Sequence, residues 1–292
     1  MNVSILSLHS YPVKSCAGIA HTQAGLGVSG LSFDRQWVVV DGNGRFMTQR
    51  TCAKLALIQP SLSDGGLTLN APEMPPLHVG RPEIGVTSIK VPVRIFSSDT
   101  LGADEGDLAA HWLGAFLETP CRLLRLHPDA ARTASPAHVD AWRAAHRDWV
   151  PGFPARHVFG FADGFPFLVT NQASLDELNE QLRAKGQPPV PMNRFRPNIV
   201  LQGLPAYEED MLFGLRIGPL RFAFVKPCGR CPVPNIDQET AITALEPGLT
   251  LAENRRFASG VLFGVNAVVA GASQEAQLAV GDNVEPYPAS EI

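Results

Sequence analysis

Short apolar runs, separated by glycine, proline and other turn residues, are the feature that most restricts the fold of this chain. Its 292 residues include 26 glycines and 25 prolines. Because strands are shorter than helices and are bounded by turn residues, the pattern predicts a mainly β fold with a few helices. We expect a strand over residues 5–13, and a hairpin over residues 35–48 around the Asp-Gly-Asn-Gly turn at 41–44.

Two segments have the period of an amphipathic helix. In the first, over residues 105–118, the apolar face is expected to carry Leu108, Trp112 and Phe116. The second covers residues 174–185, where Ser174 and Glu177 form a predicted capping box and Gly186 ends the helix. Its expected buried stripe consists of Leu175, Leu178 and Leu182.

Residues 127–156 show little regular periodicity, which predicts a long connection between two domains. We place an N-terminal β-barrel-like domain at residues 1–122 and a second domain at residues 123–292. Within the second domain we expect strands at 166–171, 195–202 and 261–270, and a hairpin at 212–226.

Charge and composition exclude some functions. Lys and Arg number 24 and Asp and Glu 28, a net charge of -4, so a partner that is a nucleic-acid polymer is not expected. No stretch approaches the roughly 20 apolar residues that span a bilayer, and the N-terminus lacks the pattern of a secretory signal. Five cysteines do not suggest a disulfide framework. A cytoplasmic protein without membrane contact is the expectation.

The segment Lys-Pro-Cys-Gly-Arg-Cys at 226–231 follows an alternating strand and carries two thiols beside two cations. Nearby positive charge favours the thiolate, which is the form that ligates soft metals. A zinc site would require further cysteine or histidine pairs, which the sequence lacks. A thioredoxin-like dithiol would precede a helix, whereas Pro232 and Pro234 follow here. Two buried structural cysteines are the third alternative.

A second set of segments is suited to an anion. In strand geometry Arg194, Arg196 and Asn198 would share one face, and two guanidiniums with an amide suit a phosphate, although a solvated strand face is equally compatible. Lys14 and Ser15 end the first predicted strand. The expected helix near residue 174 follows the turn at 161–166, and its first amides are a further candidate.

Five motifs, taken in order, resemble the MOSC family in its two-part form with an N-terminal β-barrel domain. They lie at residues 11–16 (Tyr-Pro-Val-Lys-Ser-Cys), 34–37 (Asp-Arg-Gln-Trp), 161–166 (Phe-Ala-Asp-Gly-Phe-Pro), 194–198 (Arg-Phe-Arg-Pro-Asn) and 226–231. The resemblance covers nearly the whole chain. It implies an N-terminal β-barrel-like domain followed by a C-terminal MOSC β-barrel.

The resemblance also implies a molybdenum cofactor, in which molybdopterin holds the metal and Cys231 is its protein ligand. The cofactor contacts that it carries onto this sequence are Lys14, Ser15, Arg35, Asp163, Gly164, Thr170, Asn171, Ser174, Arg194, Arg196, Asn198, Gly229 and Arg230.

The implied activity is that of the branch that reduces amidoximes and N-hydroxylated bases to their N–H forms. No cysteine follows Cys231, so electrons are expected from a separate flavin or iron–sulfur reductase. Residues 232–237 depart from the threonine-rich stretch of that branch, which leaves the preferred substrate open. A non-catalytic carrier of the cofactor, or a sulfur-handling protein, is the alternative function.

Overall fold

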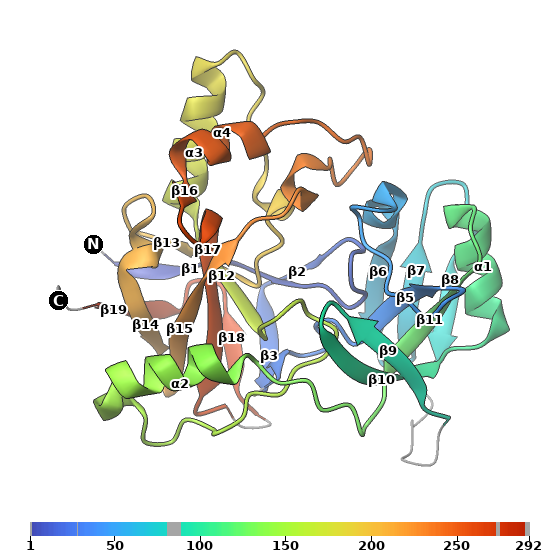
Figure 1. Cartoon of the computed structure of the whole chain (residues 1–292), viewed down its shortest axis with the longest axis horizontal. Helices are drawn as coiled ribbons and strands as arrows, with labels where there is room; N and C mark the ends of the chain where they lie inside the picture. The colour runs from blue at the N-terminus through green and yellow to red at the C-terminus, as the bar shows by residue number, and fades with distance from the viewer. Residues whose placement is uncertain (1, 28, 81–88, 273–274, 290–292) are drawn as a thin grey trace.

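The structure is a computed structural model that describes residues 2–27, 29–80, 89–272 and 275–289. It is mainly β with four α-helices in the described part, which confirms the predicted fold class. Figure 1 shows a large barrel on one side and a smaller body of sheets on the other. None of the described helices is long and apolar enough to cross a membrane.

The large body is a barrel of seven strands that closes on itself through the pairing of β12 with β17. Six of the seven junctions are antiparallel, and β12 with β13 is parallel. Parallel neighbours need a crossover, which α3 supplies between these two strands. In barrel order the strands are β12 (Phe167–Asn171), β13 (Ile199–Gln202), β1 (Val3–Ser10), β19 (Asn283–Pro288), β14 (Leu212–Ile217), β15 (Leu220–Gly229) and β17 (Gly260–Ala270).

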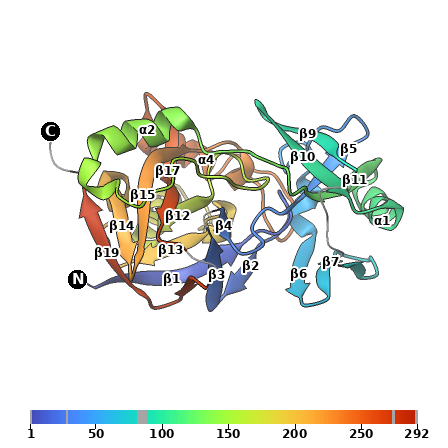
Figure 2. The ribbon, with the colours of Figure 1, turned by 90° about the horizontal axis from the view of Figure 1, so that it is seen from below.

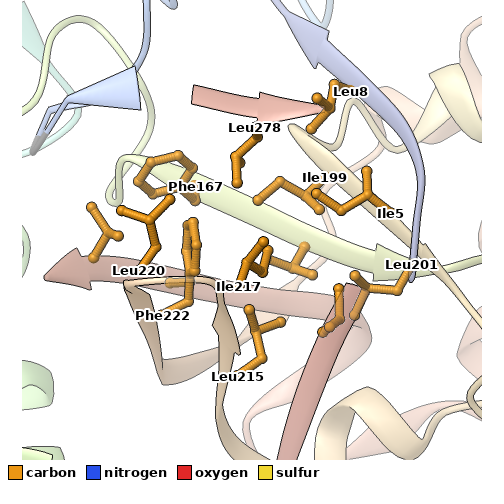
Figure 3. Close-up of a cluster of buried hydrophobic side chains, with 14 of the residues drawn as sticks. Ile5, Leu8, Phe167, Ile199, Leu201, Leu215, Ile217, Leu220, Phe222 and Leu278 are labelled. Atoms are coloured by element: carbon orange, nitrogen blue, oxygen red, sulfur yellow. The ribbon is translucent and has the colours of Figure 1, made fainter. Parts of the chain in front are cut away.

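The barrel interior is filled by aliphatic and phenylalanine side chains from these strands. Figure 3 shows Ile5, Phe167 and Phe222 directed into one cluster, with Leu278 entering from β18 (Gln277–Ala279). The rings of Phe167 and Phe222 meet edge to face at 5.2 Å. Successive side chains of a strand point to opposite faces. The apolar residues at every second position of a strand therefore point into the barrel, and the residues between them point outward.

The smaller body holds a four-stranded and a three-stranded antiparallel sheet around its own core. Trp37, Leu55, Leu69 and Leu123 are among the buried residues of that core. The four-stranded sheet is β5 (Trp37–Asp41), β11 (Cys121–Leu126), β10 (Ser98–Asp104) and β9 (Val91–Ile95), and the three-stranded sheet is β6 (Gln59–Ser63), β7 (Gly66–Asn70) and β8 (Leu77–Gly80).

The remaining elements flank the two bodies. Strands β2 (Ile19–His21) and β16 (Arg256–Phe257) extend the large sheet, while β3 (Gln23–Gly27) and β4 (Gly30–Leu31) join β18. The helices are α1 (Asp107–Leu117), α2 (Pro136–Ala145), α3 (Gln172–Ala184) and α4 (Gly248–Asn254). The first strand, β1, belongs to the large barrel, although it lies within the predicted N-terminal domain. The division of the chain into domains at residues 1–122 and 123–292 stays a prediction.

The predicted face of α1 was wrong at Leu108 only, since Trp112 is buried and Phe116 packs against the core. Leu108 is 72% exposed, whereas Ala109, Trp112 and Leu113 are buried. A strict four-residue spacing drifts around a helix of 3.6 residues per turn, so the buried stripe mixes steps of three and four.

The predicted cap of α3 was also wrong, although the helix itself is present. It begins at Gln172 with Asn171 as its N-cap, whose side chain accepts a hydrogen bond from the Ala173 amide. Ser174 is buried, and its hydroxyl donates to Glu209 instead. The buried leucine stripe is as predicted, and Gly186 has the positive φ of a helix end (+70°).

Residues 127–156 are not an irregular connection, because they include α2. Pro136 opens this helix, where its missing N–H costs nothing, and Val139 and Trp142 are buried. The indole of Trp142 donates to the carbonyl of Phe213 (2.7 Å). Figures 1 and 2 show α2 lying along β14 and β15, so the helix covers the outer face of the barrel there.

The hairpin predicted at 35–48 is present in reduced form. The carboxylate of Asp41 accepts hydrogen bonds from the Asn43 and Arg45 amides, which fixes the turn. The returning segment forms an isolated bridge between Val40 and Phe46 rather than a strand.

Candidate functional site

A cavity of about 330 Å³ is lined by residues of both bodies. Its walls combine segments near residues 14, 35, 49 and 96 with barrel segments near 163, 196 and 230. Of the fourteen predicted site residues, those that line it are Lys14, Ser15, Arg35, Asp163, Gly164, Arg196, Asn198, Gly229, Arg230 and Cys231.

An ion pair between Lys14 and Asp163 joins the two sides of the cavity. The Lys14 side chain is only 5% exposed, and burial lowers its pKa, although Asp163 offsets part of that effect. The Asp163 side chain is open to the cavity. Its place below the protein surface raises its pKa, but Lys14, Arg35 and Arg196 together bring the pKa down to about 2. The carboxylate is therefore ionised at neutral pH.

Two further cations meet at Tyr11. The guanidinium carbons of Arg35 and Arg196 each lie 4.3 Å from the centroid of its ring. The buried carboxylate of Asp34 accepts two hydrogen bonds from Arg35 (2.7 and 2.6 Å) and one from the Tyr11 amide (2.8 Å). Cation–π contacts and a paired carboxylate thus hold two guanidiniums in the lining of the cavity.

The backbone is strained at this site. Ser15, Arg35, Phe96 and Arg196 all line the cavity and have positive φ values of 70°, 48°, 52° and 57°. Residues with a Cβ adopt this region rarely and at a cost of about 1–3 kcal/mol each. Such strain gathers where side chains must be presented in a fixed direction, which is typical of a binding site.

The thiol segment lies where β15 ends at Gly229. The register of the pairing between β15 and β17 shifts after Phe224 and again after Pro227, so the ladder is irregular at the end of β15. Arg230 donates to the Cys228 sulfur (3.1 Å) and to the Phe195 carbonyl (3.0 Å). Cys231 is exposed, and both thiols are free. The structure thus separates a thiol held by Arg230 from one that is open to the cavity.

Asn198 lines the cavity while tying two strands together. Its side chain accepts from the Leu168 amide (3.1 Å) and donates to the His9 carbonyl (3.2 Å). With 2% exposure, it forms part of the cavity floor.

Four predicted residues lie outside the cavity lining and have structural partners. Thr170 is fully buried, Asn171 caps α3 and Ser174 contacts Glu209. Arg194 donates to the carbonyl of Pro234 (3.1 Å) and to the carboxylate of Asp237 (2.6 Å). Through these bonds Arg194 holds the segment that follows Cys231.

The strand predicted at 195–202 begins only at Ile199. Arg194 ends a short 3₁₀ turn (Met192–Arg194), and Arg196 is left-handed, so the guanidiniums do not share a strand face. Pro197 cannot donate to a ladder, which is consistent with the late start of the strand.

Sequence reasoning missed several lining residues from the smaller body. Thr48, Gln49, Arg50 and Phe96 follow or connect strands, and no local pattern marked them. The buried hydroxyl of Thr48 has no hydrogen-bond partner among the described residues, and neither has the buried Nε of Arg230. Buried polar atoms normally have partners, so these two atoms are exceptions to that rule.

Gln49 carries a direct link between the smaller body and the segment after Cys231. Its amide donates to Gln238 (2.8 Å) and accepts from it in return (3.1 Å), and Gln49 also donates to the Ser15 carbonyl (2.8 Å). Gln49 is 2% exposed. The segment after Cys231 is therefore fixed to the smaller body.

The described part of the chain contains no group of three or more His, Cys, Asp or Glu side chains that could hold a metal ion. A zinc site built from protein ligands alone therefore finds no support there. A single exposed thiol beside several cations suits a metal whose other ligands arrive with an anionic cofactor.

Comparison with known proteins agrees with this geometry. Residues 2–120 match the MOSC N-terminal beta barrel domain, and residues 156–285 match the MOSC domain. The chain belongs to the MOSC family.

Among its relatives, mitochondrial amidoxime reducing component 2 of Bos taurus is 32% identical over 96% of this chain and 82% of the relative. Mitochondrial amidoxime-reducing component 1 of Mus musculus is 30% identical over 86% of this chain and 71% of the relative. Molybdenum cofactor sulfurase of Homo sapiens is 30% identical over 97% of this chain, which spans only 32% of the length of that protein.

Proposed function

We propose that the protein is a molybdenum-cofactor oxidoreductase that reduces N-hydroxylated compounds, such as amidoximes and hydroxylaminopurines, to their N–H forms. The observation that carries the proposal is one cavity in which the exposed thiol of Cys231 lies with Lys14, Arg35 and Arg196. Relatives named for amidoxime reduction, at about 30% identity, support the same assignment.

The residues present fit the cofactor. The guanidiniums of Arg35 and Arg196 and the ammonium of Lys14 suit its phosphate, since charge-assisted bonds to phosphate are strong when donors are preorganised. The carboxylate of Asp163, which is open to the cavity, suits the N–H edge of a pterin. Cys231 would be the single protein ligand of the metal.

A bound molybdenum cofactor supplies two-electron reduction. The overall reaction breaks the N–O bond: two electrons and two protons enter, the N–H form is released and the oxygen leaves as water. The protein orients the substrate against the open end of the cavity, and Arg230 holds the loop backbone through the carbonyl of Phe195. Asp163 does not serve as the proton donor, because its low pKa keeps it ionised.

The electrons would come from a separate flavin or iron–sulfur protein, and the substrate is a small molecule. The cytoplasmic location stays a prediction.

The decisive experiment compares Cys231→Ser with Cys228→Ser as the matched control. We measure molybdenum by elemental analysis and the reduction of benzamidoxime with a chemical reductant. Cys231→Ser should lose at least about 100-fold in activity, because a metal ligand matters at least as much as the groups that orient it. Cys228→Ser should keep its molybdenum. Equal metal and activity in wild type and Cys231→Ser would contradict the proposal.

A carrier or sulfur-handling role is the second candidate, and the match to a molybdenum cofactor sulfurase over 97% of this chain favours it. Turnover separates the two functions. A protein with stoichiometric molybdenum that reduces neither benzamidoxime nor hydroxylaminopurine would be a carrier.

A further inference from the structure

The hairpin of β9 and β10 reaches the cavity through its turn. Ile95 pairs with Ser98, so Phe96 and Ser97 form a two-residue connection. Such connections favour Asn and Gly, because their φ values are positive. Phe96 has a φ of 52° and a bulky side chain, which makes it a costly residue at this position. Turn formation therefore does not explain why a phenylalanine is here.

Burial does not explain it either. Phe96 is 46% exposed and lines the cavity. Its ring meets Phe46 edge to face, with centroids 4.9 Å apart at an angle of 69°. This contact fixes the orientation of the ring while leaving a large part of its surface open to the cavity.

A cation accompanies the ring. The guanidinium carbon of Arg50 lies 5.5 Å from the centroid of Phe96, and Arg50 also lines the cavity. Arg50 is exposed and has no ion-pair partner within the described ranges of the chain. The ammonium of Lys14 also lies near the ring, 5.6 Å from its centroid. A half-exposed ring beside an exposed, unpaired planar cation is suited to a flat conjugated group that stacks on the ring or on the guanidinium.

We propose that Phe96 and Arg50 form a platform for the planar conjugated part of the substrate, so that aromatic N-hydroxylated compounds are preferred over small aliphatic ones. The proposal rests on the proposed function above. A pterin is also planar and conjugated. The ring adjoins the cofactor site, since Lys14 contacts it. The substrate is the better occupant because Phe96 and Arg50 are exposed, whereas Lys14 and Arg35, which are suited to the cofactor phosphate, are 5% and 13% exposed.

The test uses the holoprotein and the ratio of kcat/KM for benzamidoxime to that for acetamidoxime. Phe96→Asn removes the ring and places in the turn a residue that tolerates positive φ, so the variant should fold. The ratio should fall about fivefold to tenfold, the range expected for one lost aromatic contact. Phe96→Tyr should keep the wild-type ratio. Arg50→Gln should lower it less, since a cation–π contact at an exposed site is weaker.

Phe257→Ala is the matched control. Phe257 is 47% exposed and lies 4.7 Å from the guanidinium carbon of Arg255, but it does not line the cavity. Its loss should leave the ratio unchanged. A ratio that stays the same in Phe96→Asn would overturn the platform. So would a loss of molybdenum and pterin in step with activity, because the ring would then belong to the cofactor site.

If the wild type reduces neither compound, the proposed function fails. The platform is then tested separately, by measuring the binding of the two compounds. Calorimetry with benzamidoxime and acetamidoxime then compares wild type with Phe96→Asn. Benzamidoxime binding that is weakened about fivefold or more in the variant, with acetamidoxime unaffected, supports the platform. Equal binding by both proteins, or no binding by the wild type, overturns it.

Discussion

The two sides of the cavity are built differently. On the barrel side, Asn198 precedes a strand directly and Gly229 ends one, so the closed sheet fixes their positions. On the side of the smaller body, Ser15, Arg35 and Phe96 are loop or turn residues with positive φ. On the barrel side Arg196 also has a positive φ, of 57°. The barrel wall therefore carries less local strain than the opposite wall, where three lining residues are presented from strained turns.

Strained turns persist only when neighbours hold them. The carbonyl of Arg35 accepts a hydrogen bond from the Phe161 amide (2.8 Å), which ties one such turn to the chain that leads into the barrel. Lys14 and Gln49 make the corresponding contacts through Asp163 and Gln238. The positions of the side chains on the wall of the smaller body therefore depend on contacts with the barrel side.

The largest effect is expected where the two sides touch backbone to backbone. A Cβ on Gly160 would lie 2.5 Å from the carbonyl oxygen of Arg35, which is far inside normal contact. Gly160→Ala should lower the free energy of unfolding by about 2–3 kcal/mol, a typical cost of overpacking, and should release cofactor. Urea unfolding measures the first effect and molybdenum content the second. Gly42→Ala is the control, since a Cβ there meets nothing within 4 Å and Gly42 does not line the cavity.

An effect of similar size on the free energy of unfolding is expected from a residue that belongs to the barrel side alone. Glu209 is fully buried against Ser174, and burial raises its pKa from 4.5 to about 7. Between these values the folded protein keeps a proton that the unfolded chain has released, so stability falls as pH rises from about 4.5 past 7. Glu209→Gln removes this dependence.

At pH 8 Glu209→Gln should be more stable than wild type by about 3 kcal/mol, and near pH 4.5 the two should be close. Chemical unfolding over that pH range makes the measurement. Site occupancy should not change, because the cavity lining does not include Glu209. Parallel pH profiles for the two proteins would show that this carboxylate is ionised in the fold.

The smallest of the three effects on stability concerns the pair of side-chain amides, Gln49 and Gln238, that links the smaller body to the segment after Cys231. Gln49→Ala should cost about 1 kcal/mol of stability for the lost hydrogen bonds and leave the segment after Cys231 free to move. A double-mutant cycle with Gln238→Ala measures the coupling. Arg216→Gln breaks the half-exposed ion pair with Glu285 and should cost less, in accord with surface pairs elsewhere. Additive effects of the two glutamine variants would mean that the link is not significant.

The elements that local pattern predicts well are those with a strong period. The leucine stripe of α3, the strand β12 and the hairpin of β14 and β15 all follow from spacing and turn residues. Errors arise where a tertiary contact decides between local options. Ser174 has the chemistry of a cap, but the buried Glu209 takes its hydroxyl. The helix α2 was missed because its buried face, around Trp142, is short and depends on packing against the barrel.

By itself the sequence determined the mainly β fold class, the family motifs and the ten predicted residues that meet at the cavity. Only the tertiary structure decided that β1 completes the large barrel, that Arg196 and Arg35 meet at Tyr11, and that Phe96 enters the cavity. The physical reason is distance along the chain. Period and turn chemistry are local, whereas the walls of the cavity join segments as far apart in the sequence as Lys14 and Asn266, whose meeting depends on sheet closure.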